Sequence, residues 1–256
     1  DVLIEDIMET EIISVSTLAD KEDVAHQLRK YDLLALPVLD TDGLLVGIVT
    51  FDDAMDVMVE EATEDITKMA AVAPSEKTYF EVSAWEHAKR RIPWLLVLMF
   101  SSIITGTIIT RYEDAFAAIP LLVSFIPMLM DTGGNCGSQS STLIIRGIAL
   151  NQVTFHDFFR VIWKEFRVSL IVGVVLAIAN GLRIYLTYQQ AGMAIVIALS
   201  LVATVISAKL LGCILPMCAK KIGLDPALMA SPLITTIVDA SSIMIYFFIA
   251  TKVFHL

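Results

Sequence analysis

The sequence is poor in charge. Asp, Glu, Lys and Arg make up only 18% of its 256 residues, compared with about 25% in a soluble domain, and 56% of its residues are hydrophobic. A disordered, a collagen-like and an ordinary cytosolic protein are therefore excluded. The charges are also unevenly placed, since residues 1–91 hold 21 of the 28 acidic residues but only 8 of the 18 basic ones. We expect an acidic, water-soluble part followed by a long apolar part.

Motifs of enzymes and of metal centres are missing as well. There is no Walker loop, no HExxH and no nucleophile–base constellation, which argues against an enzyme and against an ATP-driven pump. The cysteines lie in apolar segments without CxxC spacing and indicate small core side chains. The histidines are isolated: His26, His87, His156 and His255. Asp1 stands in place of Met, and no basic and apolar leader precedes the acidic part, so we expect either that the chain is a fragment or that a segment N-terminal to it has been removed.

Uncharged runs in the apolar part predict five membrane spans, because about 20 apolar residues of helix cross a bilayer. The second span holds Pro120 and Pro127 and, after these prolines, Gly133, Gly134 and Gly137, so we expect it to be broken or kinked. Five spans line a pore poorly, and we therefore expect a dimer. The predicted spans cover residues of about 92–110, 115–145, 168–188, 193–219 and 226–251.

Basic residues in the loops predict the orientation of these spans. They precede the first span and fill the loops between the second and third and between the fourth and fifth. By the positive-inside rule, the acidic domain is cytoplasmic and the C-terminus lies outside. The residues are Lys89, Arg90 and Arg91, then Arg146, Arg160, Lys164 and Arg167, and finally Lys220 and Lys221.

The acidic part is predicted to be a small α+β domain. The pattern of apolar and turn residues predicts a strand at 12–15, followed by a helix that opens at Ser16 or Thr17. It also predicts strands at 35–39 and 44–50 around a turn at 40–43, and a second helix that runs through Met58. The segments 36–38 (LPV) and 47–53 (GIVTFDD) make it resemble a CBS domain. That resemblance implies that Thr50 and Asp53 hold an adenosine nucleotide; the alternative is that they cap the second helix.

The predicted second helix carries a stripe of acidic residues without nearby basic residues in the sequence. Asp52, Asp56, Glu60 and Glu64 recur at four-residue steps, which places them on one face of a helix, where like charges repel. No Lys or Arg occurs between residues 52 and 65, whereas solvated faces normally mix signs. We weigh a solvated face against a surface that senses a divalent cation, which would also include Asp53 and Glu61.

Asp239 is the strongest functional candidate. It lies 13 residues after Pro226 and 12 before Thr251, near the bilayer midplane, where a charge costs roughly 2.5–3.5 kcal/mol on insertion. A polar stripe accompanies it on the predicted helix, and two copies in a dimer would match one divalent cation. Few carboxylates suit Mg²⁺, which keeps its waters. The stripe consists of Pro232, Thr235, Thr236, Ser242 and Tyr246.

Two alternatives concern the intramembrane charges. Asp239 is protonated or pairs with a lysine such as Lys209, instead of holding a cation. Lys209 itself snorkels to the cytoplasmic side, bonds a helix end or tunes the field of the pore. The polar stretch at residues 131–142 is expected to be buried in protein or to line a water-filled path, because polar backbone is tolerated at membrane depth only there.

Two long motifs make the chain resemble the MgtE family of Mg²⁺ channels. The first comprises MDTGGN at 130–135 and QSSTLIIRG at 139–147, and the second runs from DPALMASPL at 225–233 to Asp239. The resemblance implies a homodimer whose pore lies at the dimer interface and is lined by the second and fifth spans, with hydrated Mg²⁺ at Asp239. Its pore-lining residues would be Gly134, Asn135, Pro232, Thr235, Thr236 and Ser242.

The resemblance also fixes the expected domains and their regulation. It implies a mainly α protein with a CBS domain at 1–62, a connecting or plug helix at 63–91, of which 81–91 ends at the membrane face, and a transmembrane domain at 92–256. Cytosolic Mg²⁺ at the acidic residues favours closure, and ATP at the CBS module modulates it. The family's helical N-terminal domain and first CBS module are not in this chain.

The expected function is a Mg²⁺-selective channel of the plasma membrane that is driven by the ion gradient and the membrane potential. One alternative is a broader divalent-cation transporter for Co²⁺, Mn²⁺ or Ni²⁺, because one carboxylate per subunit does not itself reject these ions. The other is a membrane-anchored CBS nucleotide sensor, which the midplane Asp239 disfavours because an anchor needs no such residue.

Overall fold

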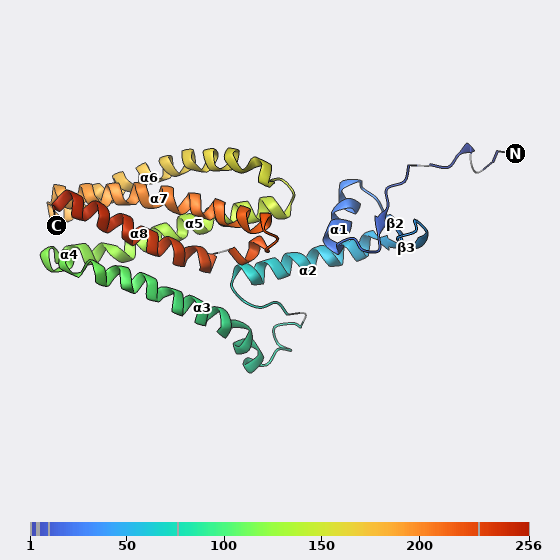
Figure 1. Cartoon of the computed structure of the whole chain (residues 1–256), viewed down its shortest axis with the longest axis horizontal. Helices are drawn as coiled ribbons and strands as arrows, with labels where there is room; N and C mark the ends of the chain where they lie inside the picture. Colours follow the sequence, from blue (N-terminus) through green and yellow to red (C-terminus); the bar gives the residue numbers. More distant parts are fainter. Residues whose placement is uncertain (1, 4–5, 10, 76, 230, 256) are drawn as a thin grey trace. The chain divides into compact units, whose positions relative to one another are not determined.

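The computed structural model describes residues 2–3, 6–9, 11–75, 77–229 and 231–255. Asp1 and Ala230, which belong to the predicted N-terminal domain and to the DPALMASPL motif, lie outside the described residues. The chain divides into two compact units, Asp1–Asp65 and Ile66–Leu256. The protein is mainly helical with one small sheet, which confirms the predicted fold class (Figure 1).

The first unit is an α+β fold around a three-stranded sheet of order β1-β2-β3. β1 pairs in parallel with β2, and β2 pairs antiparallel with β3. The predicted first helix begins later than expected, because Asp20 rather than Ser16 caps it and accepts a hydrogen bond from the Glu22 amide. The elements are β1 (Val15–Ser16), α1 (Lys21–Lys30), β2 (Ala35–Leu39), β3 (Leu45–Thr50) and α2 (Phe51–Met69).

The turn between β2 and β3 forms as predicted. The Asp40 carboxylate accepts hydrogen bonds from the amides of Asp42 and Leu44, and Gly43 adopts a φ of +78°, which side chains disfavour. The sheet then packs α1 and the start of α2 over one apolar core. The buried residues of this core are Val15, Val24, Ala25, Leu28, Leu36 and Ala54.

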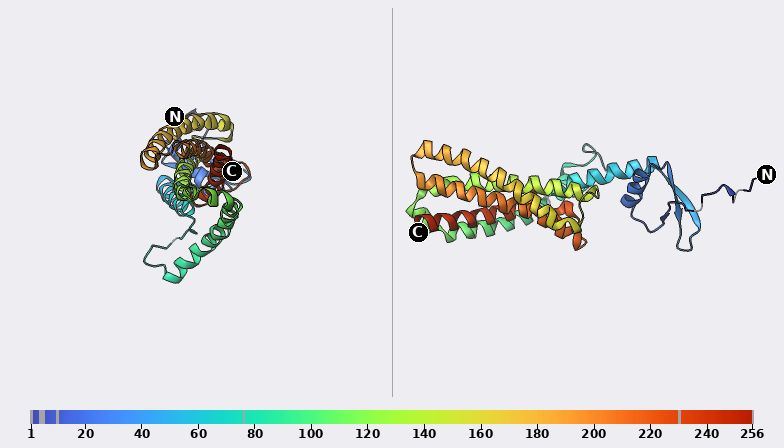
Figure 2. Two further views of the ribbon diagram at one scale, coloured as in Figure 1. Left: turned by 90° about the vertical axis from the view of Figure 1, so that its left-hand side faces the viewer. Right: turned by 90° about the horizontal axis from the view of Figure 1, so that it is seen from above.

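The second unit consists of long helices. Besides the last turn of α2, it holds α3 (Ala84–Arg111), α4 (Glu113–Ala118), η2 (Pro120–Phe125), α5 (Ile126–Ala149), η3 (Phe155–Asp157), α6 (Phe158–Tyr188), α7 (Ala191–Lys221), η4 (Pro226–Met229) and α8 (Ser231–Phe254). α5 packs against α7 and α8, α6 packs against α7, and α3 packs against α8 (Figure 2). α5, which carries the first family motif, is therefore held between two other helices.

The predicted break lies at the start of the second span. Pro120 opens the 3-10 helix η2, and the Ile126 amide donates to Val123 in a 3-10 bond. The Tyr246 hydroxyl of α8 donates to the carbonyl of Leu122, at 2.9 Å, so this irregular backbone is satisfied by a neighbouring helix. The glycine-rich residues that follow continue as regular helix within α5.

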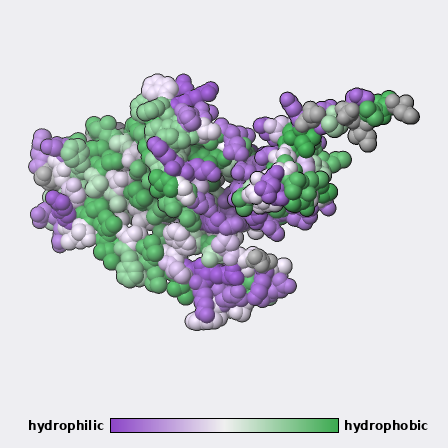
Figure 3. All heavy atoms as spheres, turned by 45° about the vertical axis from the view of Figure 1, so that its right-hand side comes forward, coloured by the Kyte–Doolittle hydropathy of each residue, from purple (hydrophilic) through white to green (hydrophobic). Residues whose placement is uncertain are grey.

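Among the described residues, four helices are long and apolar enough to cross a membrane: Ala84–Arg111, Phe155–Tyr188, Ala191–Lys221 and Pro226–Phe254. They contain the predicted first, third, fourth and fifth spans. α5 has 24 residues and reaches about 36 Å, but its polar centre lowers its hydropathy, so the count of five spans stays a prediction. Hydrophobic side chains cover much of the surface of the helical unit (Figure 3).

Glycines let α5 approach α7 and α8 closely. A Cβ on Gly212 of α7 would lie 2.3 Å from the Gly137 carbonyl oxygen, and a Cβ on Gly137 would lie 2.8 Å from Ile234 of α8. Small residues of this kind let membrane helices pack backbone against backbone. The position of α5 therefore depends on the absence of side chains at these two sites.

We predict that Gly212→Ala separates α5 from α7. The new methyl group meets backbone, which cannot rotate away, and overpacking of this kind costs about 1–3 kcal/mol or more. The measurement is the fraction of detergent-purified protein that stays monodisperse after heating. Gly106→Ala is the matched control, because a Cβ there meets nothing within 4 Å. Equal heat resistance of the two variants would contradict the predicted contact.

Candidate functional site

Asp239 lies half-buried in the middle of α8, opposite the glycines of α5. A Cβ on Gly134 would lie 3.9 Å from the Asp239 carboxylate oxygen Oδ1 and 3.1 Å from Thr235 Cγ2. Gly134, Thr235 and Asp239, which were predicted as site residues from two distant motifs, are thus brought together. The Ser141 hydroxyl joins the same two motifs further along, since it donates to the Met229 carbonyl at 3.0 Å.

α5 presents a polar stripe that is exposed in the single chain. Asp131, Asn135, Gln139 and Thr142 follow one another at steps of three or four residues, which places them on one face of the helix, and all four are exposed. Polar side chains inside a span face protein or water, so this face is not suited to lipid.

The remaining predicted lining residues take two different positions. Pro232 and Thr236 are half-buried on α8, and the hydroxyls of Thr235 and Thr236 both donate to the Pro232 carbonyl, at 3.0 and 3.1 Å. Ser242 instead is buried inside the bundle, 2.7 Å from where a Cβ of Gly133 would lie. Its hydroxyl has no hydrogen-bond partner among the described residues, nor do those of Ser200 and Thr204 on α7.

The carboxylates of this unit do not form a closed metal cage. Nowhere in the described part of the chain do three or more His, Cys, Asp or Glu side chains gather as metal ligands. One carboxylate from α8 and one from α5 are too few to replace the water around a divalent cation. Such a pair is suited to an ion that keeps most of its hydration shell, as Mg²⁺ does.

Lys209 has a partner other than Asp239. Its side chain on α7 is only 5% exposed, and Nζ donates to the Ser140 hydroxyl at 3.3 Å. Ser140 in turn donates to Oε2 of Glu165 on α6, at 2.9 Å. The ammonium group, the hydroxyl and the carboxylate therefore connect α7, α5 and α6. Neither Ser140 nor Glu165 was singled out from the sequence, although Glu165 is an acidic residue among the basic residues Arg160, Lys164 and Arg167.

The acidic stripe lies on α2, where its helical spacing was predicted. Asp52, Asp56 and Glu60 are exposed, as is Asp53 beside them, and Glu61 and Glu64 are half-buried. Lys21 of α1 lies 2.9 Å from Glu61 and 3.6 Å from Glu60. The hydrogen bond to Glu61 is the main reason that the pKa of Lys21 is raised. Part of the stripe is therefore neutralised by a residue distant in sequence.

Thr50 and Asp53 bind each other at the start of α2. The Thr50 hydroxyl donates to Asp53 Oδ2 at 2.5 Å, and its amide donates to the same oxygen at 3.3 Å. This is the helix-end role that sequence analysis set against nucleotide binding, because it satisfies a donor that the first turn leaves free.

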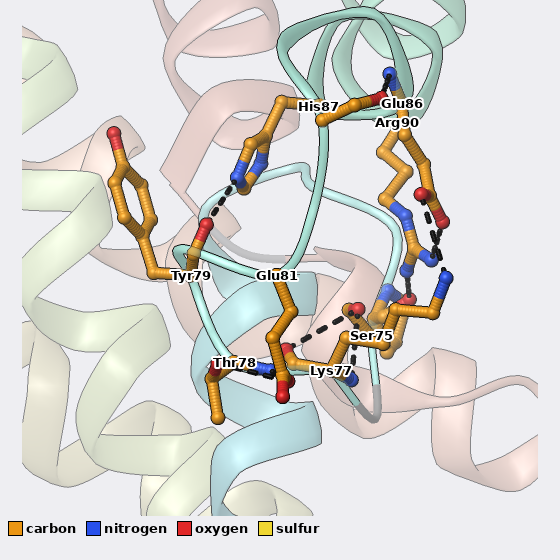
Figure 4. A network of polar contacts seen from close by, with 10 residues as sticks. Ser75, Lys77, Thr78, Tyr79, Glu81, Glu86, His87 and Arg90 are labelled. Carbon is orange, nitrogen blue, oxygen red and sulfur yellow. Dashed lines mark hydrogen bonds and ion pairs between the residues drawn. The ribbon is translucent and has the colours of Figure 1, made fainter.

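The segment between α2 and α3 folds onto the first turns of α3 (Figure 4). Arg90 donates to the Pro74 carbonyl and to Glu86, and the Thr78 amide and hydroxyl donate to Glu81. The hydrogen bond from the backbone amide of Thr78 is the main reason that the pKa of Glu81 is lowered. Residues 84–91 of the expected connecting helix are the first turns of α3 and continue into the first span.

Comparison with known proteins places these features in one family. The model of the MgtE family, described as divalent cation transporters, matches residues 126–249, and the CBS domain model matches residues 4–60. The chain is 39% identical to the magnesium transporter MgtE of Bacillus subtilis over 252 residues, 98% of this chain and 55% of that protein. It is 38% identical to that of Thermus thermophilus over 245 residues, 96% of this chain and 54% of that protein.

A third relative gives the same picture. The magnesium transporter MgtE of Enterococcus faecalis is 36% identical over 251 residues, which cover 98% of this chain and 55% of that protein. The chain thus spans about half the length of the relatives that it matches. Candidate residues of this section lie in both matched segments. The CBS match contains Thr50 and Asp53, and the MgtE match contains Gly134 and Asp239.

Proposed function

Because the chain belongs to the MgtE family, we propose that it conducts Mg²⁺ across the plasma membrane through a path at Asp239. The observation that carries the proposal is the half-buried carboxylate of Asp239 in an apolar helix, against Gly134 of α5. A carboxylate at this depth is costly and is a functional candidate by default. The relatives are named as transporters, which agrees with transport rather than catalysis.

The path is completed by a second copy of the chain. The exposed polar stripe of α5 supports this step, because Asp131, Asn135 and Gln139 would otherwise face lipid. Two copies of Asp239 on one axis supply two negative charges for one hydrated Mg²⁺. The membrane potential drives entry, since moving two charges through 100 mV releases about 4.6 kcal/mol.

The acidic domain lies in the cytoplasm and the C-terminus outside. The basic residues near the predicted cytoplasmic ends of the spans support this orientation, among them Arg160 and Lys164 on α6 and Lys220 and Lys221 on α7. Cytosolic Mg²⁺ then reaches the stripe on α2 directly.

The experiment that tests transport is Mg²⁺ influx into vesicles that hold the purified chain, with empty vesicles as the control. Competition by Co²⁺, Mn²⁺ and Ni²⁺ separates the two ion-transport hypotheses. A selective path keeps its Mg²⁺ influx, whereas a broader divalent-cation transporter loses it. Absence of any influx favours the third hypothesis, a membrane-anchored nucleotide sensor.

Cytosolic Mg²⁺ closes the path by binding to the acidic stripe of α2. Two observations support a mechanical link: α2 is one continuous helix through Met69, and Lys68 in its last turn forms an ion pair with Asp225 at 2.7 Å. Asp225 opens the segment that leads into η4 and α8. A ligand shifts the equilibrium between the open and the closed path only through its different affinity for these two states. The two states differ in how closely the acidic carboxylates approach one another. ATP at Thr50 and Asp53 would modulate closure.

We predict that Mg²⁺ protects residues 60–91 from protease at constant ionic strength. Ion binding neutralises the repulsion along the stripe, so the helix and the following segment open less often. The measurement is limited proteolysis during a Mg²⁺ titration. The double variant Asp52→Asn, Asp56→Asn should need several-fold more Mg²⁺, and Asp42→Asn in the β2–β3 turn is the matched control. Protection that is the same in all three proteins would contradict a role of the stripe.

A further inference from the structure

A pocket of about 210 Å³ lies where α5 ends, η3 begins and α7 ends. These segments are found at the same end of the helical bundle in both views (Figures 1 and 2). The apolar lining of the pocket comes from Ile148, Val153, Phe155 and Met217, and its polar lining includes Asn151 and Lys220. The mouth is therefore polar and the floor apolar, since Ile148 and Met217 are buried while Asn151 and Lys220 are exposed.

The polar groups at the mouth are available to a ligand. Within the part of the chain that the structure describes, the side chains of Asn151 and Lys220 form no hydrogen bond or ion pair. Thr154, by contrast, already donates its amide and hydroxyl to Asp157, at 3.1 and 2.9 Å. The carboxylate of Asp157 is engaged in capping η3. An ammonium group and an amide without partners are suited to an anionic oxygen ligand.

The surroundings of the pocket are basic and aromatic. Lys221 lies 4.2 Å above the ring of Phe155, and Arg167 lies 5.9 Å from the ring of Trp163. On the first turns of α6, Phe159 and Trp163 are 83% and 60% exposed, and Arg160 and Lys164 stand beside them. Exposed aromatic rings mixed with cations are typical of the membrane–water interface and of anionic lipid sites.

We propose that this pocket binds the phosphate-bearing headgroup of an anionic phospholipid. Lys220 and Asn151 contact the phosphate, the floor contacts the glycerol part, and the acyl chains lie along the exposed rings of α6. Free phosphate shares the charge but gains nothing from the apolar floor or from Phe159 and Trp163, which favours the lipid. The inference requires a membrane-spanning bundle but not Mg²⁺ transport, so a lipid-binding measurement separates its failure from that of the proposed function.

The test is binding of phosphatidylglycerol and phosphatidylcholine to the purified full chain by native mass spectrometry. We expect the wild-type protein to retain phosphatidylglycerol preferentially and Lys220→Gln to bind it about fivefold more weakly, as expected for the loss of one lysine near an anionic surface. Lys252→Gln is the matched control, because Lys252 is an exposed lysine in the last turn of α8.

Several results would overturn the proposal. They are equal retention of the two lipids, an unchanged affinity in Lys220→Gln, or a loss of equal size in Lys252→Gln. Soluble glycerol phosphate distinguishes the sources of the phosphate: competition at equal concentration would assign the pocket to a free phosphate ligand. The melting midpoint of Lys220→Gln in detergent checks that this variant is folded, and Asn151→Ala provides a second, uncharged variant for which weaker lipid binding is expected.

Discussion

Replacing Asp239 by alanine is expected to abolish Mg²⁺ uptake in cells that lack their own Mg²⁺ transporters. The expected loss is complete, because no other carboxylate lies on α8 and Asp131 of α5 then remains as a single negative charge per chain on these two helices. Asp239→Asn should be equally inactive, since it keeps the size of the side chain and removes the charge that attracts the ion. The measurement is growth rescue together with uptake of Mg²⁺.

The control for this prediction lies on the same helix. The Ser241 hydroxyl donates to Val238 of α8 itself, at 2.9 Å, so Ser241→Ala should transport at the wild-type rate. Size-exclusion profiles of the variants show whether the loss comes from misfolding. Uptake by Asp239→Asn at the wild-type rate would remove Asp239 from the path.

Removing the carboxylate of Glu165 is expected to destabilise the protein. Lys209 is 5% exposed and reaches Glu165 through Ser140. Glu165→Gln therefore leaves the buried ammonium group without the negative charge that it reaches through Ser140. Breaking a direct buried ion pair costs about 3–5 kcal/mol, and the loss through a bridging hydroxyl should be smaller. Lys209→Met should cost less, because Glu165 is only half-buried and water can solvate its charge.

The double variant makes this prediction specific. Lys209→Met combined with Glu165→Gln should recover most of the lost stability, because removing both charges leaves none buried alone. The measurement is the melting midpoint of the four proteins in one detergent. A double variant no more stable than Glu165→Gln, or a Glu165→Gln variant as stable as the wild type, would contradict the pairing of Lys209 with Glu165.

Local patterns predicted much of this structure. The short apolar runs at 35–39 and 44–50 and the turn at 40–43 between them predicted β2 and β3, and Pro120 predicted the break before α5. Proline and turn residues act on their own backbone, so their effect is visible in sequence. The sequence also singles out Asp239 as a candidate, because a charge in the middle of an apolar run is conspicuous without any knowledge of its neighbours.

The partners of charged and polar side chains were not predictable in the same way. Lys21 forms an ion pair with Glu61, and Lys209 is connected to Glu165 through Ser140, across distances in the chain that periodicity does not reveal. Ser242 lies only about 60° around the helix from Asp239, and that rotation is sufficient to turn it towards Gly133 and Thr204 inside the bundle. Such details depend on which helices pack together, which only the tertiary structure determines.

The central claim is that Mg²⁺ crosses the membrane at Asp239. The most direct measurement is Mg²⁺ influx into sealed vesicles that contain the purified chain or its Asp239→Asn variant, at the same inside-negative potential. The account predicts rapid influx with the wild-type chain and only the leak of empty vesicles with Asp239→Asn. Equal influx with both proteins, or no influx above that of empty vesicles with either, would contradict it.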